Sequence, residues 1–284
     1  MVLKTVFATL LAAGLAAVAG TACIAFGGLY DVSATAQHTR FVYALMERAM
    51  RASVRLRARG IEAPAPSEAA LVRGAACYRS ECLQCHGAPG VAPEAIGKSM
   101  QPHPGPLVDA ARRWRERELY WITRHGIKMT GMPAWEMRLS EADLWAVTGF
   151  VARLPELSPE QFQSRLASAA GEQCAGAQDA LSASAPRPVG VRAERERGAR
   201  ALRQYACIGC HTIPGLTGPD AQVGPPLQGL ASRSLIAGRL PNTEDNLVRW
   251  IRAPNAVKPG TAMPDMGVTE AHAREIATYL STLH

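Results

Sequence analysis

Two short motifs in the sequence combine cysteine and histidine at the same spacing. They are Cys82-Leu83-Gln84-Cys85-His86 and Cys207-Ile208-Gly209-Cys210-His211. On a helical turn the two cysteines of a motif project from one side, and the histidine four residues after the first cysteine lies there too. Two thiols can then form thioethers to one porphyrin edge while the imidazole reaches its iron. This spacing is the attachment signal for c-type haem, so the chain is predicted to hold two covalently attached haem c groups.

The alternative is a zinc site in which four thiolates, those of Cys82, Cys85, Cys207 and Cys210, bind one ion. Zinc would not require a histidine directly after both cysteine pairs, and an oxidising exterior would endanger free thiolates. A thioredoxin-like redox pair needs a strand followed by a helix, a pattern that the sequence lacks. Haem attachment is therefore the favoured interpretation.

A methionine followed by proline recurs at a comparable distance after each motif, at Met132-Pro133 and Met263-Pro264. Methionine opposite histidine is a known axial pair for haem iron and raises its reduction potential. Proline keeps the residue before it out of helical conformation. We expect Met129 and Met266 to pack against the porphyrin. The predicted iron ligands are His86 and Met132 in the first copy and His211 and Met263 in the second.

The two copies share a longer ordered pattern. A glycine, Gly74 or Gly198, precedes each motif, and an apolar-periodic segment, 139–154 or 268–283, follows each methionine. These last segments are predicted to be helices, since Ser140 and Thr269 are suitable N-caps. Within each copy, a stretch rich in Gly and Pro follows the cysteine–histidine motif and indicates a loop, at residues 87–106 and 214–226. The chain is therefore predicted to be all-α, with a tandem duplication of a small helical domain.

Residues 5–30 carry no charge, and about 20 apolar residues suffice to cross a bilayer. A cleaved signal peptide is the alternative, but the apolar run continues beyond the small residues near Ala19. We expect a single-pass anchor in the cell inner membrane, with the haem domains on the periplasmic side where covalent haem attachment takes place. The arginines after this segment oppose the positive-inside bias.

The net charge of +7 is concentrated in the region that follows the apolar segment. Apolar residues recur at helical spacing between the arginines of residues 40–59, which indicates either an amphipathic helix on anionic lipid headgroups or a solvated helix. No basic surface with interleaved aromatic residues is evident, so membrane lipid is an expected partner and nucleic acid is not. The expected organisation is a transmembrane helix (1–34), a juxtamembrane amphipathic helix and linker (35–64), a first domain (65–155), a linker (156–192) and a second domain (193–284).

In this order the motifs resemble the class I cytochrome c family, once in each predicted domain. The whole layout is similar to membrane-anchored di-haem cytochromes c that feed respiratory complexes. The resemblance implies that Gly74 and Gly198 let the first helix approach the last, beside Trp145 or Tyr279. It also implies that the carbonyl of Pro225 accepts a hydrogen bond from the proximal histidine. In the first copy, residues 104–107 have similar composition but leave the accepting carbonyl open.

The resemblance implies an electron carrier in a respiratory chain and not an enzyme. Its expected partners are redox proteins: a membrane dehydrogenase, an oxidase, or a small cytochrome or cupredoxin. A di-haem peroxidase is the alternative, with Glu136 and His125 as its acid–base groups. Another is the haem subunit of a larger membrane complex. Trp114, Trp121 and Trp250 could donate their indole N–H groups to haem propionates, but packing in the core is the favoured interpretation. His103, His125 and His272 are expected at the surface, and Cys77 and Cys174 could form a disulfide.

Overall fold

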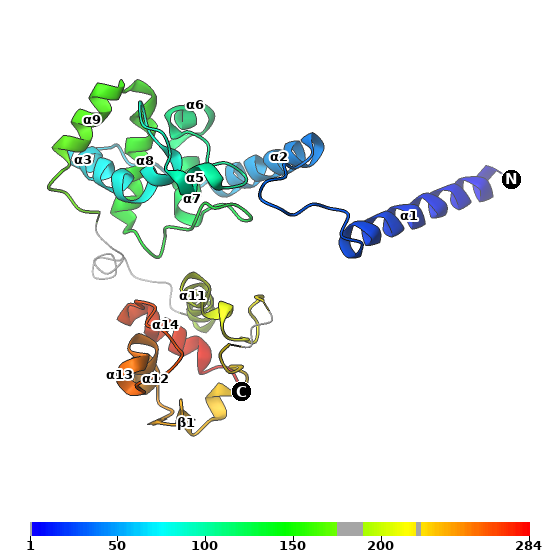
Figure 1. Ribbon diagram of the computed structural model, residues 1–284, viewed down its shortest axis with the longest axis vertical. Coiled ribbons are helices and arrows are strands. Elements are labelled where there is room, and N and C mark those ends of the chain that lie inside the picture. The colour runs from blue at the N-terminus through cyan, green and yellow to red at the C-terminus, as the bar shows by residue number, and fades with distance from the viewer. Residues whose placement is uncertain (1, 175–189, 220–222) are drawn as a thin grey trace.

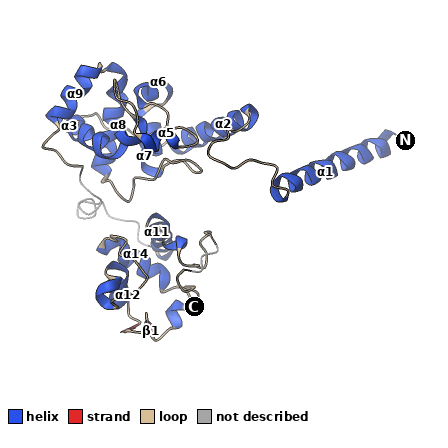
Figure 2. Ribbon diagram, viewed as in Figure 1, coloured by secondary structure: helices blue, strands red, loops and turns tan. Residues whose placement is uncertain are grey.

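The computed structural model describes residues 2–174, 190–219 and 223–284, and this part of the chain is mostly helical (Figures 1 and 2). The first helical bundle contains α3 (Glu68–Cys77), α4 (Leu83–His86), α5 (Ala95–Ser99), α6 (Ala110–Arg113), α7 (Glu116–His125), α8 (Glu141–Arg153) and α9 (Pro159–Ser168). The second contains α11 (Val191–Gln204), α12 (Glu244–Arg252), α13 (Pro254–Val257) and α14 (Glu270–Leu280). The all-α prediction is confirmed. A short antiparallel hairpin, β1 (Leu235–Ile236) with β2 (Leu240–Pro241), was not foreseen.

Helix α1 (Val2–Phe26) extends away from both bundles and buries no residue against them (Figure 1). Its 25 residues have a mean hydropathy of 2.0 over the most apolar window, and none of that window is buried. A helix of this length and composition suits a membrane span, because its side chains have no protein surface to pack against.

Helix α2 (Arg40–Arg57) begins at Thr39, whose side chain accepts a hydrogen bond from the backbone N–H of Val42. Its C-terminal half packs on the first bundle: Val54 and Ala58 are buried, and the Arg51 guanidinium lies 5.4 Å from the Trp114 ring centroid. The arginine-rich residues 40–57 thus form the predicted helix, and one side of this helix packs on the first bundle.

The first core is built where α3 crosses α8. A Cβ atom at Gly74 would lie 2.1 Å from the backbone oxygen of Ala146 and 2.9 Å from Cβ of Phe150, so only glycine permits the crossing. Trp145, expected beside this contact, directly precedes Ala146, and its ring stacks on Tyr120 with 3.9 Å between ring centroids.

The second core repeats this arrangement with α11 and α14. A Cβ atom at Gly198 would lie 2.3 Å from the backbone oxygen of Glu275 and 2.7 Å from Cβ of Tyr279, which is the contact implied for Tyr279. His272, expected at the surface, is in fact buried on α14, where its Nδ1 lies 2.9 Å from the Tyr205 hydroxyl. Its periodicity on α14 places it on the core side, and a hydroxyl partner makes that burial tolerable.

Residues 156–174 differ from the linker that the sequence predicts. Ser158 caps α9 with a reciprocal capping box, and Phe162 on α9 is completely buried in the first core, against Tyr78 and Phe150. A disulfide between Cys77 and Cys174 then joins the end of α3 to the segment after α9. The remainder of the predicted linker up to residue 189 lies outside the described residues.

Candidate functional site

The first cysteine–histidine motif lies at the end of α3, where a π-helical turn (Tyr78–Cys82) leads into α4. Nδ1 of His86 lies 2.8 Å from the backbone oxygen of Gly105. Because a carbonyl can only accept, Nδ1 must carry the proton, and Nε2 is left with its lone pair free to bind a metal. Burial lowers the pKa of His86, which favours this neutral form.

The histidine of the second motif makes the same kind of hydrogen bond, although the local backbone structure differs. Cys207 begins a short 3-10 turn after α11, and Nδ1 of His211 donates to the backbone oxygen of Pro225 at 2.8 Å. This is the hydrogen bond that the resemblance implies for Pro225. Gly105 and Pro225 each stand two residues before a leucine, so the first copy uses the same position, and the carbonyl that the sequence left open is that of Gly105.

The imidazole of His211 packs directly on a glycine. A Cβ atom at Gly224 would lie 2.4 Å from Cε1 and 2.6 Å from Nδ1 of that ring. No side chain fits there, so the backbone before Pro225 forms one wall against the histidine and fixes its plane.

Both methionine loops are held by one kind of hydrogen bond. The backbone N–H of Met132 donates to Oγ1 of Thr130 at 3.1 Å, and that of Met263 donates to Oγ1 of Thr261 at 3.3 Å. Met132 and Met263 are half-buried. The threonine two residues before each methionine was overlooked, although it recurs in both copies and could have been found by aligning them.

The neighbouring methionines lie at the protein surface, and their expected packing against a porphyrin stays a prediction. Met129 is 80% exposed and Met266 is 43% exposed, so neither packs into a core. Met100 was not singled out from sequence, yet its sulfur lies against the Met132 loop, 2.6 Å from where a Cβ of Gly131 would be. Nothing in its local sequence signals this contact, which only the tertiary structure creates.

A buried donor beside the first methionine supports a haem at this site. The indole N–H of Trp135 is buried and has no hydrogen-bond partner. An unsatisfied buried donor costs about 1–3 kcal/mol, so native proteins usually satisfy it. A haem carboxylate is a suitable acceptor, and together with a free Nε2 on His86 this donor shows that the residues fit a haem. Trp135 is not one of the three tryptophans considered from the sequence. Among those three, Trp114 packs against the first core and Trp250 against the second, as expected.

The zinc alternative finds no support in the described part of the chain. There the only grouping of three candidate ligands is Cys77, Asp143 and Cys174, and its two cysteines are joined in the disulfide. Burial raises the pKa of Cys82 to about 12 and that of Cys207 to about 11, so both thiols are protonated at neutral pH in the free chain.

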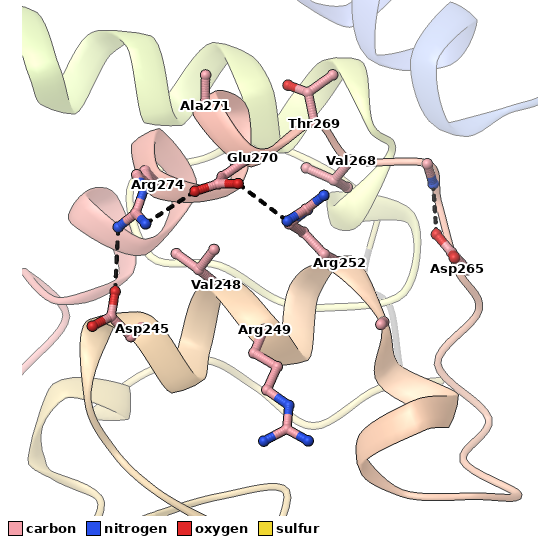
Figure 3. Close-up of a pocket in the computed structure, with 12 residues that line it drawn as sticks. Asp245, Val248, Arg249, Arg252, Asp265, Val268, Thr269, Glu270, Ala271 and Arg274 are labelled. Atoms are coloured by element: carbon pink, nitrogen blue, oxygen red, sulfur yellow. Dashed lines mark hydrogen bonds and ion pairs between the residues drawn. The ribbon is translucent and has the colours of Figure 1, made fainter. Parts of the chain in front are cut away.

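A cavity of about 880 Å³ lies between α12, the segment after Met263 and the first turn of α14 (Figure 3). Glu270 pairs with Arg252 at 3.4 Å and with Arg274 at 3.1 Å, and Arg274 also pairs with Asp245 at 3.3 Å. Neither the second cysteine–histidine motif nor Met263 lines this cavity. These four charged side chains neutralise one another, and their ion pairs join α12 to the first turn of α14.

Comparison with known families assigns both bundles. Residues 69–151 match the family described as Cytochrome C oxidase, cbb3-type, subunit III, and residues 195–284 match the family described as Cytochrome c. Both bundles are cytochrome c domains. The tandem cytochrome c arrangement predicted from sequence is thereby confirmed, and such domains carry covalently bound haem c with its iron.

Two curated proteins resemble part of the chain. Cytochrome c oxidase subunit 2 of Alkalihalophilus pseudofirmus is 36% identical over 88 residues, which is 31% of this chain and 25% of the relative. The protein of the same name from Bacillus sp. (strain PS3) is 38% identical over 87 residues, 29% of this chain and 24% of the relative. The chain thus spans about a quarter of the length of these relatives. A solved chain of the Kuenenia stuttgartiensis reducing HAO-like protein complex covers 78% of this chain and 99% of its own, at 17% identity and a TM-score of 0.27.

Proposed function

We propose that this protein is a membrane-anchored electron carrier in which each cytochrome c domain holds one haem c. Cys82 and Cys85 would attach the first haem, with His86 and Met132 as iron ligands. Cys207 and Cys210 would attach the second, with His211 and Met263 as ligands. The observation that carries the proposal is the repeated hydrogen bond from the Nδ1–H of each motif histidine to a backbone carbonyl.

The residues around each iron position suit electron transfer without bond rearrangement. When bound, haem iron supplies one-electron chemistry by changing between the ferrous and ferric states. The carbonyls of Gly105 and Pro225 fix the tautomer and plane of the histidines and make them stronger donors. Thr130 and Thr261 hold the methionine loops in place. Because hydrogen bonds hold both the histidines and the methionine loops, little reorganisation should accompany a change of charge.

The two domains touch close to both candidate sites. The Arg200 guanidinium of α11 lies 3.5 Å from Glu136, four residues after Met132, and Met137 packs against the second core. Helix α11 leads directly to the second cysteine–histidine motif. This contact supports a route for electrons between the two haems within one molecule.

The anchor and the relatives support a proposal for the location and for the class of partner. Helix α1 suits an inner-membrane anchor with both domains on the periplasmic side, where covalent haem attachment takes place. The family matched by residues 69–151 and both curated relatives are named as oxidase subunits, which favours a terminal oxidase or a comparable membrane complex as redox partner. A peroxidase is not favoured, because Glu136 is held by Arg124, His125 and Arg200 and is not free to act as an acid–base group.

The ligand assignment predicts the outcome of removing either methionine from the haem-loaded protein. Met132→Ala and Met263→Ala should each remove the low-spin His/Met signature of one haem and lower one reduction potential by on the order of 0.1 V or more. Redox titration with optical and paramagnetic spectra measures this. The controls Met129→Ala and Met266→Ala should leave both potentials unchanged. Unchanged spectra in both ligand variants would remove the assignment.

A mass measurement tests the haem count separately. Full-length protein from a host with cytochrome c maturation machinery should gain the mass of two haems. The Cys82→Ala, Cys85→Ala double variant should retain only one. A protein without added mass would contradict the electron-carrier proposal as a whole.

A further inference from the structure

A second cavity, of about 570 Å³, lies between the end of α2 and the start of α7, and we call it the arginine pocket. Six arginines line it: Arg55, Arg59, Arg112, Arg113, Arg115 and Arg117. None of its lining residues belongs to a cysteine–histidine motif or a methionine loop. Whatever the pocket binds, it is separate from the residues proposed to ligate iron.

The positive charge of the arginine pocket is poorly compensated. Asp109 lies 3.6 Å from Arg112 and 3.5 Å from Arg113, so one carboxylate serves two guanidinium groups. The lining carboxylate, Glu118, is only 5% exposed and accepts from the backbone N–H of Arg115 at 3.0 Å, which engages it in capping α7. The other four arginines form no ion pair with a described carboxylate.

The pocket wall is held in place by contacts that are independent of any ligand. Arg117 donates to the backbone oxygen of Arg59 at 3.5 Å, which joins α7 to the end of α2. The half-buried ring of Trp114 lies under Arg51. Guanidinium groups pair with phosphate bidentately, and a cavity of this size matches a small ligand or headgroup. The shared chemistry that would fill it is a phosphate.

The length of the connecting chain allows this pocket to reach a membrane surface. Residues 27–39 connect α1 to α2 and reach at most about 45 Å when extended, whereas the 18 residues of α2 are about 27 Å long. The end of α2 can therefore approach the surface that α1 enters. Tryptophan and arginine are also the side chains that suit the headgroup region.

We propose that the arginine pocket binds the phosphate of an anionic phospholipid headgroup, which would hold the first cytochrome c domain against the bilayer. This inference rests on α1 as the anchor but not on the redox role, so the two can fail separately. Free phosphate and an acidic face of a redox partner are the competing occupants.

The test uses full-length, haem-loaded protein in a neutral detergent, titrated with short-chain phosphatidylglycerol, short-chain phosphatidylcholine and inorganic phosphate. Calorimetry should detect binding of phosphatidylglycerol only. Arg55→Gln with Arg59→Gln should weaken that binding by about tenfold or more. The matched control is Arg48→Gln with Arg57→Gln, which removes two charges from α2 outside the pocket and should change it by less than about threefold. Arg112→Gln, on α6, provides a second pocket variant, with haem content and unfolding temperature checked in each.

Four results would overturn the proposal. Equal losses in the pocket and control pairs would indicate diffuse attraction to a basic helix. Inorganic phosphate that binds as tightly as the lipid would indicate a free-anion site. Absence of binding to any probe would leave the pocket without this role. Normal lipid binding by the pocket pair, together with slower electron exchange with a partner protein, would assign the arginines to protein docking.

Discussion

At the scale of single residues, the two candidate sites depend on backbone groups as much as on side chains. His86 and His211 receive their orientation from the carbonyls of Gly105 and Pro225. These carbonyls lie in loops of similar composition, and each places an acceptor 2.8 Å from Nδ1 of the ring. The consequence is that substitutions outside the ligand set should disturb a site when they move the loop backbone.

The contact between Gly224 and the His211 ring makes such a substitution available. Gly224→Ala should displace the imidazole, because the new Cβ would lie 2.4 Å from Cε1. We expect a changed spectrum for one haem and a loss of stability of roughly 1–3 kcal/mol in the second domain. Optical spectra and thermal unfolding measure both effects.

Gly209→Ala is the matched control, since a Cβ at Gly209, inside the second motif, meets nothing within 4 Å. Equal behaviour of the two alanine variants would mean that the loop does not fix the histidine.

At the scale of helices, close crossings define each domain. The α3–α8 crossing requires Gly74, whereas Gly149 on α8 has its nearest neighbour, Cβ of Pro66, 3.5 Å from a built Cβ, an ordinary contact. Two glycines in one helix pair therefore serve different purposes, and only the first is needed for packing.

Substituting alanine at these two positions should have opposite effects. Gly74→Ala should destabilise the first domain by about 2 kcal/mol or more, because the helices must separate. Gly149→Ala should leave stability unchanged or raise it by up to about 1 kcal/mol through helix propensity. Denaturant unfolding of the haem-loaded protein measures both. A harmless Gly74→Ala would argue against the close crossing.

The disulfide between Cys77 and Cys174 fastens α9 to the rest of the first domain across a sequence separation of 97 residues. Replacing both cysteines by alanine should destabilise the domain by about 2–5 kcal/mol, since the unfolded chain regains the freedom of a long loop. Cys23→Ala, at the exposed cysteine of α1, is the control and should have no effect on this transition. A double variant with unchanged unfolding temperature under oxidising conditions would contradict this role.

At the scale of the whole molecule, the domains meet at a small charged contact around Glu136. This carboxylate lies within 4 Å of nitrogen atoms of Arg124, His125 and Arg200, and Arg200 belongs to the second domain. Burial lowers the pKa of His125, although the charge of Glu136 opposes that effect. The positive charge that faces Glu136 therefore comes mainly from Arg124 and Arg200. The Arg200 side chain is 47% exposed, which limits the strength of the link.

Removal of this link should loosen the domain contact without unfolding either domain. Arg200→Gln should shift the docked population by no more than about fivefold, because a half-exposed pair contributes at most about 1 kcal/mol. Pulsed paramagnetic measurements between the two ferric irons should show a broader distance distribution. Arg192→Gln is the control, since Arg192 pairs with Glu196 in its own helix. A distribution that stays narrow in both variants would place the domain contact elsewhere.

The sequence by itself determined the chemistry and the helical class of this protein. The attachment motifs, the methionine–proline pairs and the apolar N-terminal segment are local patterns, and each acts within a few residues of chain. Their recurrence was enough to predict two helical domains of one kind, and the families matched by the two halves agree. Gly198 and Tyr279 were also paired correctly, because the resemblance to class I cytochrome c implied that contact.

Only the tertiary structure decided which distant groups meet. The carbonyl of Gly105 meets His86, Met100 approaches Gly131, and Phe162 on α9 packs against Tyr78, so each contact joins segments that are distant in sequence. The burial of the Trp135 indole N–H is likewise decided by tertiary packing. Residues 156–174 read as a linker because their polar and alanine-rich composition hides a single buried aromatic residue. Such contacts depend on how whole helices pack, and local periodicity does not encode which surfaces they bring together.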